Sequence, residues 1–251
     1  MAQEAQEQAR EQKVAIITGA SRGIGASLVE AFRQLGYGVV ANSRAIGESD
    51  IKSEIRSDPA IVVVEGDISS PKTAERVAGA AIERFGRIDT LVNNAGVFIP
   101  KPFLDYSETD LSAMMAVNVA GFFHISQQVI PRMLKAGSGH IVNITATIAE
   151  QPMAQLPTAL ATLTKAGLNA ATRALAIEYA TSGIRVNAVS PGPTRTSMHP
   201  PKLHDFLASL APMGRMAEPR EISDAVLYLE NAAFVTGEIL HVDGGASAGR
   251  W

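Results

Sequence analysis

The sequence contains no cysteine among its 251 residues. A disulfide framework, a thiol nucleophile and a cysteine-ligated zinc site are therefore excluded. The composition suits a reducing compartment, and we expect the protein to be cytoplasmic. The five histidines show no ligand-like spacing with carboxylates, so we also expect no metal site.

The chain also has no excess of positive charge. The chain carries 22 Lys and Arg against 25 Asp and Glu, and its basic residues form no stripe interleaved with aromatic residues. Nucleic acid is therefore not expected as a partner. No apolar run reaches the length of a membrane span, and residues 1–12 form a polar tail, frayed or disordered, without a signal-peptide core. We expect a small-molecule substrate and no membrane partner.

Seven short apolar runs alternate with longer helical patterns. The runs are 14–18, 38–42, 61–66, 90–94, 140–145, 184–189 and 238–242, and the helical stretches include 24–35, 71–86, 108–136 and 155–181. Because helices separate the strands, the connections are crossovers, which predicts a parallel sheet. Strands that are nearly all apolar indicate cover on both faces. The sequence predicts an α/β fold: residues 13–251 form a single domain with a doubly wound, mainly parallel seven-stranded sheet of Rossmann type.

The longest irregular segment is SPGPTRTSMHPP, residues 190–201. It follows the carboxyl end of a predicted strand, where open α/β sheets bind their ligands, so we interpret the region 190–212 as a substrate lid. An ordinary surface loop stiffened by prolines fits the same pattern equally well.

A glycine-rich turn, TGASRGIG at residues 18–25, joins the first strand directly to a helical pattern. Gly19 permits a tight turn, Gly23 lets the backbone approach a pyrophosphate, and Gly25 lets the helix pack close to the strand. The amides of the helix N-terminus face the anion. The order of strand, turn and helix predicts a dinucleotide cradle that includes Ser21 and Ile24.

Three further motifs follow in order: NNAG at 93–96, SPG at 190–192 and VDGG at 242–245. With the glycine-rich turn, they resemble the short-chain dehydrogenase/reductase family over nearly all of residues 13–245. The resemblance implies several binding roles: Asp67 and Ile68 at the adenine, Asn93, Ala95 and Gly96 along the adenosine side, and Pro191, Gly192 and Thr196 beside the nicotinamide. Alone, Asp67 is also compatible with a helix cap and Thr196 with an ordinary loop hydroxyl.

The residues that end the second strand bear on the choice of cofactor. In Rossmann folds an acidic residue there binds the ribose 2′-OH of NAD, whereas this chain has Asn42, Ser43 and Arg44. Arg22 and Arg44 can bind a 2′-phosphate through charge-assisted hydrogen bonds, so we expect NADP(H) in preference to NAD(H). The alternative is that both arginines are solvated surface charges.

The family's catalytic pattern is a Ser, a Tyr, a Lys and a helix Asn, with Tyr one helical turn before Lys. By resemblance Lys165 matches the Lys, but the preceding turn holds Ala161. The Ser position falls on Ala146, or near Ile148 when counted back from Ala161, and neither carries a hydroxyl. Thr145 and Thr147 are the nearest substitutes, on one face of the strand if it extends that far.

The remaining candidates carry alternatives of their own. Asn118 matches the family's Asn, or it satisfies a helix kink. Lys165 takes part in acid–base chemistry, or it only holds the ribose. None of the four tyrosines lies within 140–165, and only Tyr106 is in a position to approach; His199, in the lid, is an alternative proton donor or a plain surface histidine.

These features favour an NADP(H)-dependent oxidoreductase that acts on a small ketone, quinone, imine or activated alkene without the usual tyrosine. A general acid usually supplies roughly 10²–10⁴ in rate, and a quinone, an iminium ion or an activated alkene needs it least. An inactive NADP(H)-binding sensor or partner subunit is the alternative, and a lyase or isomerase is favoured less. Met153, Leu156, Met198 and Phe206 suggest an apolar pocket, or core or oligomer contacts. By resemblance we expect a homodimer or homotetramer that pairs helices 108–136 and 155–181.

Overall fold

The computed structural model describes residues 12–44 and 57–249. The predicted polar tail, residues 1–12, therefore lies outside the described residues except for Gln12.

The described residues form a seven-stranded sheet in the order β3-β2-β1-β4-β5-β6-β7, and every neighbouring pair is parallel. The strands are β1 (Val14–Thr18), β2 (Gly38–Ser43), β3 (Ile61–Glu65), β4 (Thr90–Asn93), β5 (Gly139–Ile144), β6 (Ile184–Pro191) and β7 (Ile239–Val242). The chain starts in the middle of the sheet, builds one half outward to β3 and then returns to build the other half from β4. The predicted doubly wound Rossmann-type sheet is confirmed.

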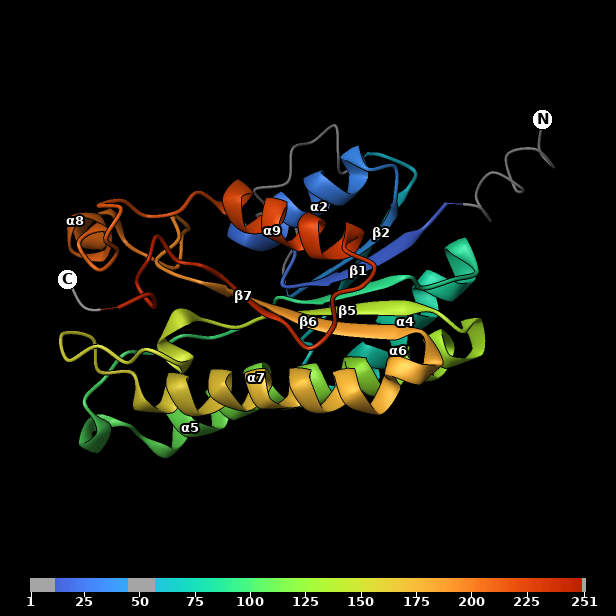
Figure 1. Ribbon diagram of the computed structural model, residues 1–251. Helices are drawn as coiled ribbons and strands as arrows, with labels where there is room; N and C mark the ends of the chain where they lie inside the picture. Colours follow the sequence, from blue (N-terminus) through green and yellow to red (C-terminus); the bar gives the residue numbers. More distant parts are fainter. Residues whose placement is uncertain (1–11, 45–56, 250–251) are drawn as a thin grey trace.

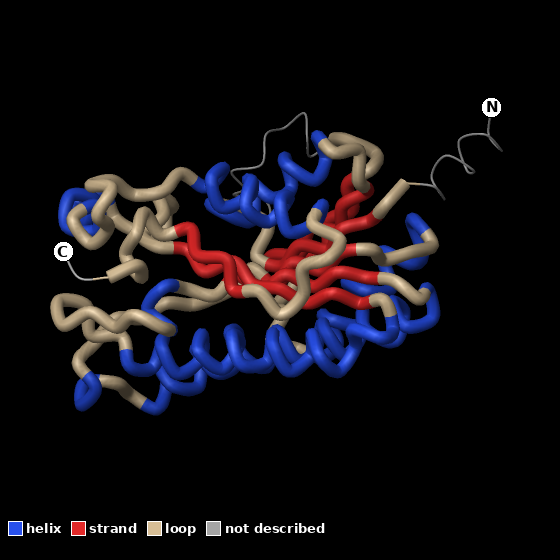
Figure 2. Tube along the Cα trace, viewed as in Figure 1, coloured by secondary structure: helices blue, strands red, loops and turns tan. Residues whose placement is uncertain are grey.

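Helices cover both faces of the sheet (Figures 1 and 2). Helices α2 (Gly23–Gln34) and α9 (Pro219–Asn231) pack on one face, and α4 (Pro71–Phe85), α6 (Gly121–Ala136) and α7 (Ala159–Tyr179) on the other. Each strand sends alternate side chains to the two faces: Ala15 and Ile17 of β1 join one core, Val14 and Ile16 the other. This double cover explains why the strands are so apolar.

Several short elements connect these layers. They are η1 (Phe103–Asp105), α5 (Glu108–Met114), the π-helical turn η2 (Met115–Ala120), η3 (Thr147–Ala149), η4 (Ala180–Ser182), η5 (Pro201–Leu203) and α8 (His204–Ala208). Within the described part of the chain, no helix is both long enough and apolar enough to cross a membrane.

Three helical features differ from the sequence prediction. The helix expected over 155–181 begins at Ala159, because Pro157 precedes it and Met153 and Leu156 form an isolated bridge. The stretch 108–136 contains a π-helical turn between α5 and α6. Helix α9 was not among the predicted stretches, although Glu218 and Glu221 form a capping box around Pro219.

A buried polar network joins α9 to the amino-terminal edge of the sheet. The Glu230 carboxylate accepts hydrogen bonds from the Tyr37 hydroxyl, at 2.9 Å, and from His140 Nδ1, at 2.7 Å. His140 Nε2 faces donors from Asn187, at 3.0 Å, and Arg185, at 3.4 Å, so His140 is neutral with its proton on Nδ1. Burial and the nearby Arg185 charge lower the pKa of His140. The network fixes α9 at the end of the sheet opposite the glycine-rich turn.

Candidate functional site

The glycine-rich turn folds tightly onto the carboxyl ends of β1 and β4. Gly19 adopts a φ of 65°, and a Cβ on Gly25 would lie 2.1 Å from the Gly19 carbonyl oxygen. The Asn94 side chain donates to the carbonyls of Thr18 and Gly19, at 2.9 and 3.1 Å. The turn is therefore a rigid cradle in which neither glycine tolerates a side chain.

The cradle leads into the N-terminus of helix α2. Arg22 occupies the N-cap position without a capping hydrogen bond from its side chain, and the first turn of α2 contains no acidic residue. Backbone amides and the positive end of the helix dipole together form an environment that suits a phosphate. The segment 190–212, the candidate lid, reaches this point, because a Cβ on Gly23 would lie 2.9 Å from Cγ2 of Thr196.

The end of β2 presents hydroxyls and cations to the same loop. Asn42 is buried and donates to the carbonyls of Val64 and Gly66, so its side chain supports the sheet. The Ser43 hydroxyl donates to Ser21 Oγ at 2.8 Å, which ties β2 to the glycine-rich turn. Arg22 follows Ser21 in the sequence, Arg44 follows Ser43, and both arginines are exposed.

The residues predicted to bind the adenine and the adenosine have different surroundings in the structure. Asp67 accepts a hydrogen bond from the Ser69 amide at 2.9 Å, and Ser70 is the N-cap of α4, so the helix-cap alternative for Asp67 is wrong. Ile68 packs in the core. The Asn93 side chain is buried and donates to Asn143 at 2.9 Å, while Ala95 and Gly96 are half-buried and the Ala95 amide donates to the Thr18 hydroxyl at 3.0 Å.

Lys165 lies beside Gly96 at the same edge of the sheet. Its Nζ donates to the Ile144 carbonyl at 2.8 Å, and enclosure of the amino group lowers the pKa of Lys165 to about 8. A Cβ on Gly96 would lie 3.3 Å from Lys165 Nζ and 3.4 Å from Asn118 Oδ1. Gly96 therefore leaves the space in which these two polar groups approach each other.

Asn118 occupies the π-helical turn and holds the segment after NNAG. Its Oδ1 accepts from the Val97 amide at 2.8 Å, while its Nδ2 donates to the Val97 carbonyl at 3.0 Å and to Thr164 Oγ1 at 3.1 Å. The side chain is buried. It acts as a two-point clamp on the strand-to-loop connection that carries Gly96.

Ala161 faces an apolar cluster one turn before Lys165. The cluster is formed by Met114, Ile148, Leu160 and Ala161, and Val97, Phe98, Ile99, Tyr106 and Ala146 pack against it. Tyr106 does approach this position, as its place in the sequence suggested, but its hydroxyl donates to the Ile99 carbonyl at 2.8 Å. The wall beside Lys165 is therefore apolar.

The two candidate threonines do not share a strand face, because β5 ends at Ile144. The Thr145 hydroxyl donates to the Val189 carbonyl at 3.3 Å. Thr147 begins the 3₁₀ turn η3 and donates to Asp243 Oδ2 at 3.1 Å. Both side chains are buried and hydrogen-bonded to β6 or to the VDGG motif.

The expected apolar pocket separates into two parts. Met153 and Leu156 pack against Leu207, Leu210 and Met216, which makes them core contacts. Met198 and Phe206 are exposed on the lid, at 52% and 39%. The four residues therefore do not form one pocket wall.

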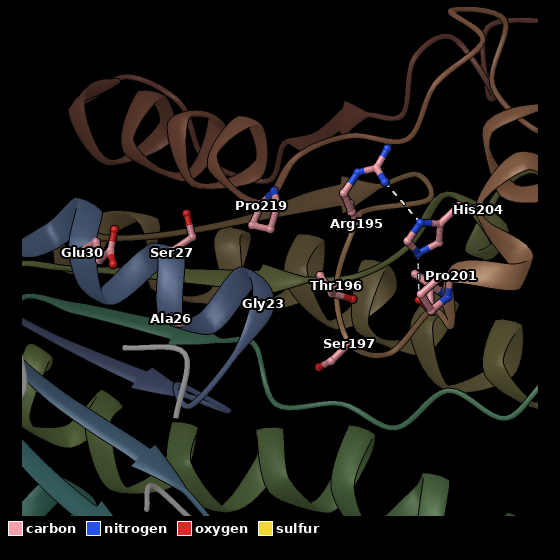
Figure 3. Close-up of a pocket in the computed structure, with 11 residues that line it drawn as sticks. Gly23, Ala26, Ser27, Glu30, Arg195, Thr196, Ser197, Pro201, His204 and Pro219 are labelled. Atoms are coloured by element: carbon pink, nitrogen blue, oxygen red, sulfur yellow. Dashed lines mark hydrogen bonds between the residues drawn. The ribbon is translucent and has the colours of Figure 1, made fainter. Parts of the chain in front are cut away.

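A hollow of about 440 Å³ lies between the lid and the outer face of α2 (Figure 3). Gly23, Ala26, Ser27 and Glu30 line it from the helix. On the other side, Arg195 donates to Glu218 at 2.9 Å and to His204 Nδ1 at 3.2 Å, and His204 Nε2 donates to the His199 carbonyl at 2.9 Å. These bonds hold the lid against α9.

Comparison with known proteins agrees with this geometry. A family described as enoyl-(acyl carrier protein) reductase matches residues 19–247. The chain belongs to the short-chain dehydrogenase/reductase family. It is 35% identical to a 3-oxoacyl-[acyl-carrier-protein] reductase of Vibrio cholerae over 94% of this chain and 97% of that protein.

Two solved structures of the family share its fold. A 3-ketoacyl-(acyl-carrier-protein) reductase from Brucella melitensis complexed with NADH is 32% identical, with a TM-score of 0.86 over 94% of this chain and 98% of the other. ElxO with NADP bound is 26% identical, with a TM-score of 0.87 over 95% and 100%. Structural relatives within the short-chain dehydrogenase/reductase family therefore bind either nicotinamide cofactor.

Sequence reasoning gave Asp243 of the VDGG motif no role in this short-chain dehydrogenase/reductase. The structure places its Cα 2.8 Å from where a Cβ on Gly192 would lie, and its carboxylate accepts hydrogen bonds from the Gly245 and Ser247 amides. Burial opposes ionisation, but hydrogen bonds from Ser247, Gly245 and Thr147 hold the pKa of Asp243 below its usual value. Asp243 therefore holds the SPG turn and Thr147 in place relative to each other. In the sequence, only the two glycines that follow Asp243 pointed to a structural role for this residue.

Proposed function

We propose that this protein is an NADP(H)-dependent oxidoreductase that transfers hydride to or from a small ketone, quinone, imine or activated alkene without a tyrosine acid. One arrangement carries the proposal: a rigid glycine cradle and the N-terminus of α2, whose first turn has no acidic residue, lie at the same sheet edge as Lys165. The cradle fits a pyrophosphate, and the bound cofactor would supply or accept the hydride.

The residues around the cradle support a binding mode for the cofactor. Gly19, Gly23, Ile24 and Gly25 would hold the pyrophosphate, with Asp67, Ile68, Asn93, Ala95 and Gly96 along the adenosine and Pro191, Gly192 and Thr196 at the nicotinamide. Lys165 would bind the nicotinamide ribose, since its ammonium lies beside Gly96. Asn93 would act through its backbone, because its side chain is bonded to Asn143.

A preference for NADP(H) rests on the end of β2. Ser43 and Ser21 form a hydroxyl pair there, and the exposed Arg22 and Arg44 each follow one of these serines in the sequence. Strand β2 ends in Asn42 and Ser43, so no carboxylate occupies the position that would repel a 2′-phosphate.

Replacing Arg44 with Ala is expected to weaken NADPH binding about tenfold or more while leaving NADH binding nearly unchanged, because a charge-assisted hydrogen bond to phosphate contributes more than 1 kcal/mol. Fluorescence titration of both cofactors measures this. Arg220→Ala, on the exposed side of α9, is the matched control for loss of a surface arginine. Equal weakening of both cofactors by Arg44→Ala would contradict the assignment.

The apolar wall at Ala161 supports acceptors whose product anion is already delocalised. With no phenol at position 161, the polar groups of the sequence-predicted catalytic positions include the Lys165 ammonium and the buried Thr145 and Thr147 hydroxyls. Both threonines are bonded to acceptors in the protein, so their role would be to shape the site, while Lys165 would stabilise developing negative charge.

The same wall also favours a second candidate, an NADP(H)-binding sensor or partner subunit without turnover. Loss of NADPH absorbance with a panel of ketones, quinones, imines and activated alkenes separates the two. Turnover with any acceptor supports the enzyme. Tight NADPH binding with no consumption across the panel would favour the sensor.

A homodimer or homotetramer is supported by an exposed apolar face on α5, α6 and α7. Ile177 is 80% exposed, Leu163 62% and Phe123 50%. These helices form one layer below the sheet (Figure 1), which suits pairing with the same layer of a second copy.

Replacing both Phe123 and Ile177 with Glu is expected to halve or quarter the mass in solution, because carboxylates would be desolvated in the interface. Light scattering after size-exclusion chromatography gives the mass. The control is Leu35→Glu, which changes an exposed leucine at the end of α2 on the other face of the sheet. If the double variant keeps the parental mass, the face is not an interface.

A further inference from the structure

We propose that His199 exchanges the proton with the substrate oxygen, in the role that a tyrosine at position 161 would otherwise fill. This inference rests on the proposed function, because it assumes that hydride transfer takes place beside Lys165. Several independent features of the lid lead to it.

The first feature is the position of the ring. The His199 imidazole packs edge to face against Phe98, with ring centroids 6.4 Å apart and an interplanar angle of 76°. Phe98 belongs to the residues packed against the cluster that contains Ala161, and it follows Gly96 by two residues. The lid thus places an imidazole against the wall in which the phenol is missing.

The second feature is that the ring is free to react. Among the described residues, no group forms a hydrogen bond with either ring nitrogen of His199, although the side chain is half-buried. By contrast, both ring nitrogens of His140 and of His204 are engaged, and His241 is bonded to Glu150. A half-buried ring normally acquires a partner, so a substrate oxygen fits here.

The third feature is that the residue is held through its backbone. The His199 amide donates to the Thr196 carbonyl at 3.0 Å, and its carbonyl accepts from His204, which Arg195 holds in turn. Figure 3 shows His204 between Arg195 and the 3₁₀ turn that begins at Pro201. The lid therefore fixes the position of His199 without using its ring.

The surrounding charges determine when the ring can donate. Burial and the neighbouring His204 lower the pKa of His199, and His204, Arg195 and Glu30 are the other titratable groups that line the same hollow. In the reductive direction hydride adds to the carbonyl carbon, the π electrons move to oxygen, and the imidazolium gives that oxygen its proton. The neutral ring then regains a proton from water. Ketone reduction should therefore fall as pH rises through the lowered pKa of His199.

The test compares His199→Asn with His204→Asn on one ketone and one quinone. We expect His199→Asn to lower kcat for the ketone about 10²-fold and to remove the fall of kcat with rising pH, with quinone reduction and NADPH affinity changed less than about threefold. We expect His204→Asn, which loosens the lid, to raise KM for the ketone and to keep the fall of kcat with rising pH, moved to higher pH because His204 no longer lowers the pKa of His199.

Three outcomes would overturn the role of His199. The first is that His199→Asn reduces the ketone with the same kcat as the parent chain. The second is that His199→Asn and His204→Asn change only KM for the ketone, and by the same factor. The third is that the wild-type chain reduces the quinone but no ketone. The proposed function itself fails separately, when the wild-type chain transfers hydride to neither acceptor.

Discussion

Ala161→Tyr is expected to reduce a simple ketone about 10²-fold faster than the parent chain near pH 8. The new phenol would lie one helical turn before Lys165, on the same face of α7. Burial lowers the pKa of Lys165 to about 8, so a substantial fraction of it remains an ammonium at this pH. That charge would lower the pKa of the phenol and make it an effective general acid, which supplies roughly 10²–10⁴ in rate.

The gain should shrink toward acidic pH, where the protonated His199 already serves as a donor. Ala161→Phe is the matched control, because it adds the same ring without the hydroxyl. Either ring must enter the cluster of Met114, Ile148 and Leu160, and overpacking costs about 1–3 kcal/mol, so thermal melting of both variants is measured alongside. Equal rates for the Tyr and Phe variants would show that a missing proton donor does not limit the parent chain.

Glu230→Ala is expected to produce the largest loss of stability among single substitutions outside the site. Removing the carboxylate leaves the Tyr37 hydroxyl and His140 Nδ1 without their acceptor and leaves Arg185 without its nearest anion. Breaking a buried charged network of this kind costs about 3–5 kcal/mol. For a chain of this length the melting temperature should fall by about 10 °C or more.

The control for that loss is Asp224→Ala on the same helix, since Asp224 is exposed and lies 3.8 Å from Arg220. Its melting temperature should change by no more than a degree or two, as surface pairs contribute little. Chemical denaturation gives the free energies. A Glu230→Ala variant as stable as the control would mean that packing alone holds α9 against the sheet.

The same network gives stability a definite dependence on pH. Hydrogen bonds from His140 and Tyr37 outweigh burial and keep the pKa of Glu230 below its usual value, while the pKa of His140 is also lowered. Both groups therefore bind protons more weakly in the folded state than in the unfolded state. Their contribution is complete above the unfolded pKa of histidine and is lost as the pH falls through the lowered values.

Local sequence patterns were sufficient to predict the strands of the sheet and the glycine cradle. The strands in the middle of the sheet could be predicted because cover on both faces makes them continuous apolar runs, as in VAIIT of β1 and GVVA of β2. The cradle could be predicted because a side chain at its glycine positions would clash with the backbone. A Cβ on Gly25, for example, would lie against the carbonyl oxygen of Gly19. Family resemblance then placed Lys165 at the same edge.

Contacts between segments far apart in the sequence could not be predicted from such local patterns. Thr147 and Asp243 are 96 residues apart and are joined only when β5 and β7 reach the same edge of the sheet. Asn93 was assigned to the groove by its motif, but its side chain bonds to Asn143 on the neighbouring strand. Similarly, the start of α7 depends on how Pro157 and the bridge between Met153 and Leu156 direct the chain.

Every proposed role depends on binding of a phosphorylated nicotinamide cofactor in the crevice beside the glycine cradle. Isothermal titration calorimetry of the full chain with NADPH, and then with NADH, tests it most directly. We predict saturable binding of one NADPH per chain, tighter than that of NADH. Absence of NADPH binding would contradict the whole account, and equal affinity for the two cofactors would contradict the role given to Arg22 and Arg44.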